Sequence, residues 1–189
     1  MFSNKSEIRA VLKEKLAGIT KPIYEDYSYK IARQLYETEE WKYSKVVGIT
    51  ISKQPEVDTY QIIRKAWEEG KTVVVPKCHP KDKSLIFRTL TEFSQLESVY
   101  YGLYEPIETQ TDAVDPNEIA LLIVPGLGYT PQGYRLGFGG GYYDRFLAQY
   151  SGSTLSLAFH EQIIPHFPIE EYDLPVAKII TPNQIVLTK

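Results

Sequence analysis

The sequence predicts an α/β fold, with one three-layer α/β/α domain around a mostly parallel central sheet. Short apolar segments rich in branched residues alternate with longer segments whose apolar residues have helical spacing. Such alternation is typical of parallel sheets covered by helices on both faces. The 189 residues contain no linker-like stretch, repeat or low-complexity tract, so residues 1–189 are expected to form a single domain.

Two amphipathic helices are expected before the first strand. The first follows Asn4, a candidate N-cap, with Glu7 placed three residues later as in a capping box. Its apolar residues have helical spacing: Ile8, Val11, Leu12 and Leu16. The second helix follows Pro22 and carries Tyr27, Ile31 and Leu35 on its apolar face. Residues 46–51 then form an apolar run that predicts a buried strand.

A strand–helix–strand unit continues from this first strand. The helix should begin at Asp58 and end at Gly70, and its apolar face contains Ile62, Ile63, Ala66 and Trp67. A strand at 72–75 completes the unit. Further short strands are expected at 85–88, 119–124, 154–158, 178–180 and 185–187.

The segment 119–150 combines a buried strand, a long loop, a glycine cluster and a helix. Pro125 ends the strand, and the helix is expected at 142–150, directly after Gly137, Gly139, Gly140 and Gly141. Free backbone N–H groups at a helix N-terminus, approached closely at glycines, favour a phosphate or carboxylate. Tyr142 stands where the G-x-G-x-x-G motif needs its last glycine, and no G-x-x-x-x-G-K-[ST] motif occurs.

Charged residues flank these glycines. Arg135 can donate two parallel hydrogen bonds to phosphate oxygens, and Asp144 can bind a magnesium ion that also contacts the phosphates. The alternative is a tight turn in which Asp144 only stabilises the first helical turn, by roughly 0.3–1 kcal/mol. Lys5 and Arg9 lie four residues apart on one face of the first helix. They can bind a phosphate group together, or they can simply form a basic helix face that is exposed to solvent.

Composition narrows the classes of function. The net charge of −3 argues against a general nucleic-acid binder. Cys78 is the only cysteine, which excludes an intramolecular disulfide and a cysteine-built zinc site and favours the cytoplasm. Charges interrupt the apolar residues of the N-terminal segment, so no membrane association is expected. The scattered histidines and serines fit neither a zinc helix nor a serine hydrolase.

Residues 125–129 (PGLGY) and 133–144 (GYRLGFGGGYYD) resemble the signature of the 5-formyltetrahydrofolate cyclo-ligase family, also called methenyltetrahydrofolate synthetases. The resemblance extends over nearly the whole chain, through Lys5-x-x-x-Arg9, Val75-Pro76-Lys77, Tyr104-Glu105-Pro106 and Asp173-Leu174-Pro175. It implies an open three-layer fold similar to that of sugar-phosphate isomerases and CoA transferases. It also implies a small-molecule enzyme, expected to be a monomer.

The activity implied by the resemblance is ATP-dependent cyclisation of 5-formyltetrahydrofolate to 5,10-methenyltetrahydrofolate. The formyl oxygen would be phosphorylated, and ADP and phosphate would be released, with ATP as co-substrate and Mg²⁺ as cofactor. A non-catalytic nucleotide- or folate-binding module is the alternative. An isomerase or transferase acting on a sugar phosphate or a CoA ester rests on fold analogy alone, which does not specify function.

The resemblance also assigns residues to roles. Arg135 and Tyr142 are the expected catalytic residues, and Asp144 and Asp173 the expected metal ligands. ATP is expected to contact Lys5, Arg9, Arg135, Leu136, Gly137, Phe138, Gly139, Gly140, Gly141, Tyr142 and Tyr143. The folate is expected to contact Ile51, Glu56, Phe138, Gly139, Gly140, Gly141 and Tyr142. Phe138 and Ala177 depart from the family, which often has arginine and aspartate there, and Arg135 or Lys77 can supply the missing positive charge.

Overall fold

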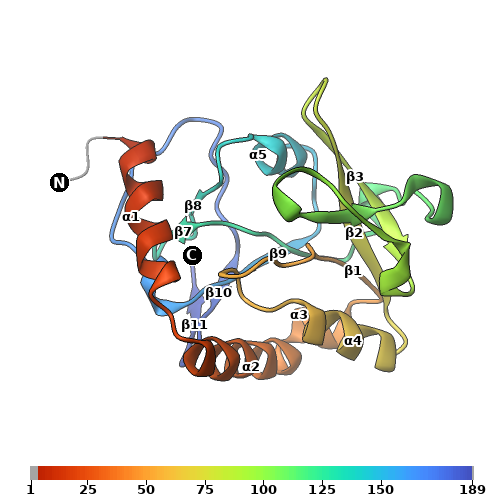
Figure 1. The fold of residues 1–189 in the computed structure, drawn as a ribbon, viewed down its shortest axis with the longest axis horizontal. Helices are drawn as coiled ribbons and strands as arrows, with labels where there is room; N and C mark the ends of the chain where they lie inside the picture. Colours follow the sequence, from red (N-terminus) through yellow and green to blue (C-terminus); the bar gives the residue numbers. More distant parts are fainter. Residues whose placement is uncertain (1–3, 189) are drawn as a thin grey trace.

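The structure, a computed structural model, describes residues 4–188 and has a seven-stranded central sheet (Figure 1). Its strands are β1 (Val46–Gly48), β2 (Thr72–His79), β3 (Ser84–Leu90), β6 (Leu121–Ile123), β9 (Ser153–Leu157), β10 (Lys178–Ile180) and β11 (Ile185–Leu187). They lie in the order β11-β10-β9-β6-β1-β2-β3. Every pair from β10 to β2 is parallel, and the edge pairs β10–β11 and β2–β3 are antiparallel. The prediction of a mostly parallel sheet is confirmed.

Helices cover both faces of the sheet, but unequally. They are α1 (Lys5–Ala17), α2 (Lys21–Glu37), α3 (Glu39–Tyr43), α4 (Tyr60–Glu68) and α5 (Tyr142–Leu147). Apolar residues of α1 to α4 pack in one core with Val73 and Val75 of β2, whereas Val74 faces a second core beside α5. In Figure 1, α2 and α4 lie below the sheet and α5 lies above it. The three-layer arrangement therefore follows from the alternation of side chains along each strand.

The helix starts agree with the signals in the sequence. Asn4 caps α1, and its side chain accepts a hydrogen bond from the Glu7 amide at 3.0 Å. Pro22 lies in the first turn of α2. The predicted start at Asp58 is two residues early: α4 begins at Tyr60, whose amide donates to the Asp58 carboxylate at 2.9 Å. The chain turns away from α4 at Gly70, where φ is +72°.

Several element ends differ from the prediction. Regular pairing in β1 stops at Gly48, so residues 49–51 already belong to the following loop. In contrast, β2 continues to His79 because β3 pairs with it in antiparallel register from Val73–Leu90 to His79–Ser84. The predicted helix 142–150 ends at Leu147. Short elements without a clear periodicity were not predicted: α3, β4 (Leu96–Ser98), β5 (Tyr104–Pro106), β7 (Gly128–Tyr129) and β8 (Arg135–Leu136).

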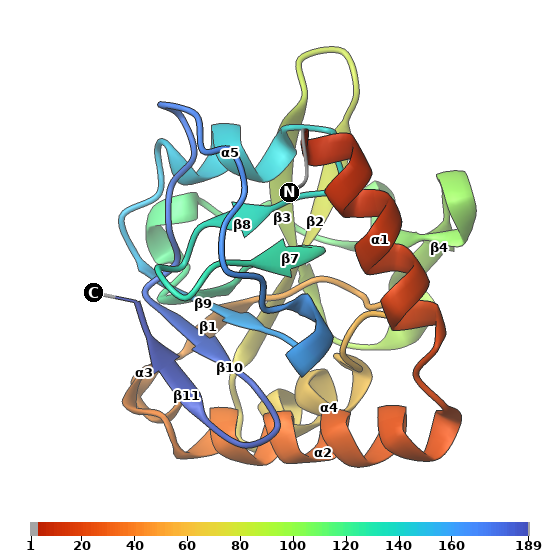
Figure 2. The same ribbon diagram turned by 90° about the vertical axis from the view of Figure 1, so that its left-hand side faces the viewer.

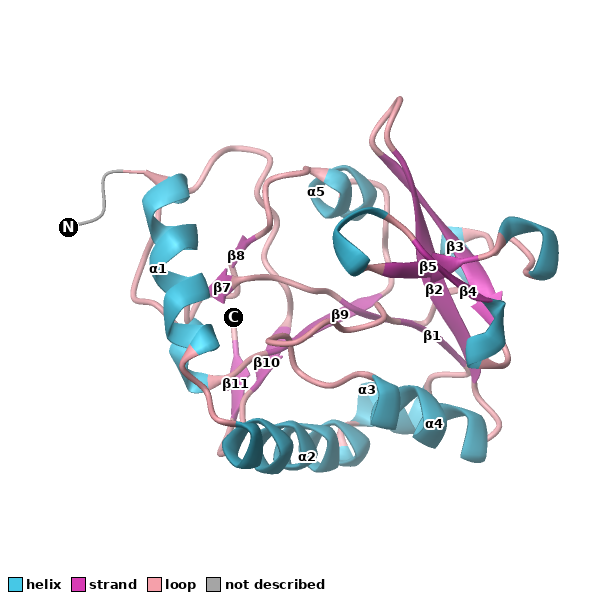
Figure 3. Ribbon diagram, in the orientation of Figure 1, coloured by secondary structure: helices cyan, strands magenta, loops and turns pink. Residues whose placement is uncertain are grey.

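Four of these short strands form two hairpins that are separate from the central sheet. The β4–β5 hairpin lies against β2 (Figure 3). The β7–β8 hairpin lies next to α1, as Figure 2 shows from the side. Within residues 4–188, no helix combines the length and the hydropathy that crossing a membrane would require.

Candidate active site

A hollow lies where the strand order of the sheet reverses. From β1 the chain proceeds outward to β2 on one side and later returns to place β6 on the other side. Ligand sites of open parallel sheets lie beyond the carboxyl ends of the strands at such a switch point. The hollow measures about 380 Å³ with the space at its open mouth, and it is lined by the loop after β1 (Ser52, Glu56, Thr59) and the loop after β6 (Pro125, Gly126).

Side-chain hydrogen bonds fix the loop after β1. The Thr59 hydroxyl donates to the Thr50 carbonyl oxygen at 2.6 Å and accepts from the Ser52 amide at 2.9 Å. The Thr59 amide in turn donates to the Ser52 hydroxyl at 2.9 Å. This reciprocal pair closes the loop without using the Glu56 side chain.

Glu56 is the acidic group of the hollow. Burial raises the pKa of its carboxyl, and the Lys53 amide and charge partly offset this effect. The Lys53 amide donates to Glu56 Oε2 at 2.8 Å, which leaves the other carboxyl oxygen as an acceptor for N–H donors of a ligand. Ile51, expected at the same site, does not line the hollow, because its side chain packs in the core with α1, α2 and α4.

Two arginines from distant segments converge on Gly137 in the glycine loop. Arg9, on α1, donates from Nε to the Gly137 carbonyl oxygen at 2.8 Å. Arg135 lies against the other side, because a Cβ on Gly137 would stand 2.7 Å from Arg135 Nη1. Only a glycine leaves room for this approach. The structure therefore brings α1 and the glycine loop together, as a shared phosphate site requires.

Arg135 is buried and only partly satisfied. Its residue exposure is 7%, and β8 pairing with β7 places it. Nη2 contacts Asp144 Oδ1 at 2.5 Å and Nη1 donates to the Pro125 carbonyl oxygen at 3.3 Å. Nε is buried without an acceptor. An unpaired buried guanidinium donor is costly, so this atom is suited to an anionic ligand.

The second predicted metal ligand also forms an ion pair. Asp173 is 8% exposed, and its Oδ2 lies 2.8 Å from Lys5 Nζ at the start of α1. The same carboxylate oxygen accepts a hydrogen bond from the Glu170 amide at 2.8 Å. The segment before β10 is thus tied to the helix that also carries Arg9.

The two carboxylates predicted to bind magnesium have the donor chemistry of a magnesium ligand. Within residues 4–188 no group of three or more His, Cys, Asp or Glu side chains could enclose a metal. Magnesium is commonly held by one or two carboxylates, with phosphate oxygens and water completing the octahedron. Asp144 and Asp173 are carboxylates of the required kind, and each forms an ion pair with a basic side chain.

Tyr142 and Tyr143 occupy different environments. The Tyr142 ring folds over Gly140, where a Cβ would stand 2.8 Å from Cδ2. Partial burial, then the neighbouring Cys78 and Glu105, raise the Tyr142 pKa, so its hydroxyl is a donor at neutral pH. Tyr143 has a buried hydroxyl without a partner, and burial raises its pKa. Phe138 is 52% exposed.

Gln162 is a lining residue that sequence reasoning missed. It is 3% exposed, and its Nε2 donates to the carbonyl oxygens of Gly126 at 3.0 Å and Leu127 at 3.2 Å. Its Oε1 accepts from the Phe159 amide at 2.9 Å. Gln162 thereby joins the loops that follow β6 and β9. The available signal was a glutamine four residues after a predicted strand and directly before Ile163 and Ile164.

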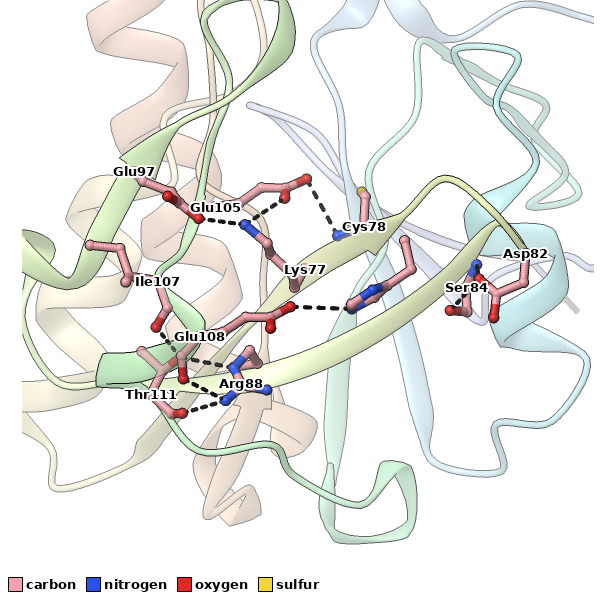
Figure 4. A network of polar contacts seen from close by, with 11 residues as sticks. Lys77, Cys78, Asp82, Ser84, Arg88, Glu97, Glu105, Ile107, Glu108 and Thr111 are labelled. Atoms are coloured by element: carbon pink, nitrogen blue, oxygen red, sulfur yellow. Dashed lines mark hydrogen bonds and ion pairs between the residues drawn. The ribbon is translucent and has the colours of Figure 1, made fainter.

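Lys77 belongs to a separate polar network on the β2–β3 hairpin (Figure 4). Its Nζ lies 2.6 Å from Glu97 Oε1 and 3.5 Å from Glu105 Oε2. Its charge is therefore already matched by the β4–β5 hairpin, which weakens the expectation that Lys77 replaces an arginine at position 138. Burial raises the pKa of the adjacent Cys78 thiol to about 12, so this thiol is a poor nucleophile.

Comparison with known proteins shows consistent similarity over most of the chain. A 5-formyltetrahydrofolate cyclo-ligase of Mus musculus is 29% identical over 189 residues, covering 94% of this chain and 93% of the mouse protein. The Escherichia coli K12 protein of that name is 31% identical over 143 residues, covering 74% of this chain and 79% of its own.

Solved structures show the same similarity in three dimensions. The NMR structure of Aquifex aeolicus 5,10-methenyltetrahydrofolate synthetase superposes with a TM-score of 0.86 at 28% identity, covering 98% of this chain and 93% of that one. A synthetase from Mycoplasma pneumoniae, with a TM-score of 0.77 at 21% identity and coverages of 95% and 99%, supports the fold alone. The model of the 5-formyltetrahydrofolate cyclo-ligase family matches residues 1–182. The chain therefore belongs to the 5-formyltetrahydrofolate cyclo-ligase family.

Proposed function

We propose that this protein catalyses the ATP-dependent cyclisation of 5-formyltetrahydrofolate to 5,10-methenyltetrahydrofolate, releasing ADP and phosphate. The observation that carries the proposal is the convergence of Arg9 and Arg135 on Gly137. Arg135 also lies against Gly126, which lines the hollow that contains Glu56, because a Cβ on Gly126 would stand 2.7 Å from Arg135 Cγ. A phosphate site and a site for an N–H-rich ring thus adjoin each other, as transfer between a nucleotide and a pterin demands. Family membership supports this proposal.

The chemistry needs activation of a poor leaving group. Transfer of the terminal phosphoryl of ATP to the formyl oxygen yields an imidate-like phosphate and ADP. The nitrogen at position 10 then attacks the activated carbon and loses its proton, and departure of phosphate completes the ring. This sequence depends on alignment and charge neutralisation more than on a protein nucleophile.

We assign the charged residues to the nucleotide. Lys5, Arg9 and Arg135 bind its phosphates together with the loop from Leu136 to Tyr143, and Arg135 neutralises charge on the transferred group. Asp144 and Asp173 would hold Mg²⁺, which when bound lowers the negative charge of the phosphates.

We assign the hollow to the folate. Glu56 accepts hydrogen bonds from the pterin N–H groups, a recognition that rejects analogues lacking those donors. Ile51 supports this loop from the core, and the loop from Phe138 to Tyr142 closes the other side. We assign the neutral Tyr142 hydroxyl to donation of a hydrogen bond during phosphoryl transfer. We also propose that the protein works in the cytoplasm as a monomer on small molecules, without nucleic acid or membrane.

The proposed reaction is tested by its chromophore. Purified protein is incubated with 5-formyltetrahydrofolate, ATP and Mg²⁺, and the absorbance of the conjugated methenyl product is followed. We expect an increase that requires ATP and is lost in Arg135→Met, because that variant lacks the buried guanidinium. Absence of any ATP-dependent signal from the folded wild-type protein contradicts the proposal. Calorimetric binding of both ligands without product would favour the non-catalytic binding module.

A further inference from the structure

Two ion pairs each join a residue that we assign to phosphate with a residue that we assign to the metal. Arg135, assigned to phosphate, contacts Asp144, assigned to the metal, at 2.5 Å. Lys5, also assigned to phosphate, contacts Asp173, the other metal candidate, at 2.8 Å. Each pair joins segments that lie apart in the sequence. In this structure, the candidate phosphate-binding cations and the candidate metal-binding carboxylates therefore neutralise one another.

Arg9 provides an internal contrast. Its Nε donates to the neutral carbonyl oxygen of Gly137, and no ion pair to a carboxylate is found for it among the described residues 4–188. The nucleotide can engage Arg9 without separating charges. Arg135 differs, because it has one buried Nε without an acceptor and one Nη that contacts Asp144. Part of the charge of Arg135 is therefore already neutralised by Asp144.

The burial of the two carboxylates determines how costly it is to separate them from their cations. The side chain of Asp173 is 6% exposed and that of Asp144 is 29% exposed. If metal-free ATP draws Lys5 and Arg135 onto its phosphates, both carboxylates lose their cations, which is costly for the buried Asp173 and less so for the half-buried Asp144. A divalent cation that arrives with the nucleotide supplies the missing positive charge. The same phosphates and carboxylates are then all compensated.

We propose that Lys5–Asp173 and Arg135–Asp144 form an ion-pair exchange that makes nucleotide and metal bind as one unit. The cations move from the carboxylates to the phosphates while the carboxylates take the metal. The proposal rests on the proposed function, because it assumes that ATP occupies this site. The proposal also has a further consequence. The carboxylates disfavour the binding of metal-free ATP, in addition to binding the metal.

The test is calorimetric binding of ATP to Asp144→Asn, in EDTA and in Mg²⁺ at equal ionic strength. The substitution keeps the shape but releases Arg135 from its charged partner. We expect metal-free ATP to bind this variant roughly tenfold more tightly than the wild type, which corresponds to about 1.4 kcal/mol. We also expect Mg²⁺ to tighten ATP binding strongly in the wild type and much less in the variant.

Two further variants make the result specific. Asp173→Asn leaves Lys5 paired only with the half-exposed Glu170, 3.6 Å away. It should change metal-free binding in the same direction, by less, which preserves the test if Asp144→Asn does not fold. Asp82→Asn is the matched control. Asp82 influences Tyr142 electrostatically, but its carboxylate accepts hydrogen bonds from Ser84. Its removal takes away one negative charge near the loop without releasing Lys5 or Arg135, so metal-free affinity should change little.

The outcomes separate the two proposals. Tighter metal-free binding in the aspartate-to-asparagine variants of the pairs, with the control unchanged, supports the exchange. Metal-free affinity that stays at the wild-type value in both folded variants overturns it, even if Mg²⁺ dependence is lost. Equal gains in the Asp82→Asn control also overturn it, because simple charge repulsion would then suffice. Absence of ATP binding to the wild type in both buffers overturns the exchange and the proposed function together.

Discussion

At the scale of single residues, environment determines what each charged group can do. Glu56 is a carboxylate in a hollow, and burial raises its pKa. Arg135 and Asp144 are adjacent opposite charges, and each partly neutralises the other. A sequence shows the side chains but not these pairings. Their chemical roles therefore depend on partners that lie up to 168 residues apart, as in Lys5 and Asp173.

The raised pKa of Glu56 leads to a prediction about stability and pH. The folded protein retains a proton that the unfolded chain releases near the ordinary pKa of 4.5. Wild-type stability should therefore fall as pH rises from that value through the folded pKa. Glu56→Gln cannot lose a proton, so its unfolding free energy relative to the wild type should increase over the same interval.

Denaturant unfolding at a series of pH values measures this difference. Glu68→Gln, which removes a carboxyl from the exposed surface of α4, is the matched control for loss of one charge. A relative stability of Glu56→Gln that decreases with rising pH would contradict the assignment of Glu56 as a buried, proton-retaining group.

At the scale of elements, the site depends on how closely α1 and two loops approach the β7–β8 hairpin. Gly128, in β7, faces Leu12 of α1, and a Cβ there would stand 2.6 Å from the Leu12 side chain. Arg9 and Lys5 lie on the same helix as Leu12. The packing of one glycine against one leucine therefore helps to set the positions of the two cations that we assign to phosphate.

Gly128→Ala should displace α1 from the hairpin. We expect a loss of stability of roughly 1–3 kcal/mol, the usual cost of overpacking, and weaker binding of ATP with Mg²⁺ because Arg9 moves away from Gly137. Thermal unfolding and calorimetry measure the two effects. Shortening Leu12 to alanine in the Gly128→Ala background should recover part of the nucleotide affinity. Unchanged affinity in a folded Gly128→Ala protein would show that α1 is positioned by other contacts.

Gln162 connects the loops after β6 and β9 through three hydrogen bonds. In Gln162→Met the side chain has similar length, but two buried carbonyl oxygens and one amide lose their partner. We expect a loss of about 2–4 kcal/mol in unfolding free energy, since an unsatisfied buried polar group costs roughly 1–3 kcal/mol. Chemical denaturation measures it, with the exposed Gln149→Met as control. A loss no larger than in the control would mean that these loops are held independently of Gln162.

At the scale of the whole molecule, the order of strands explains where the site lies. β1 and β6 are neighbours, and the chain leaves them in opposite directions across the sheet. Their loops separate at this point and leave the hollow lined by Glu56 and Gly126. The pairing of β2 with β3 and of β10 with β11 only completes the edges.

Much of this architecture was predictable because it depends on local patterns. Apolar runs marked the central strands, and the Asn4 cap marked the start of α1. The β4–β5 hairpin was not predictable, since its three-residue strands have no periodicity of their own and are held by contact with β2. The glycine loop was located from spacing. The ion pair of Arg135 with Asp144 was not, because it depends on the turn between β8 and α5.

Because the hollow lies at the switch point between β1 and β6, its lining comes from two separate parts of the chain. Glu56 comes from before the crossing and Gly126 from after it, and 69 residues lie between them in the sequence. Neither fragment alone carries a complete set of contacts. Folding of the first half during synthesis thus produces no competent pocket, and competence arises only when β6 inserts beside β1.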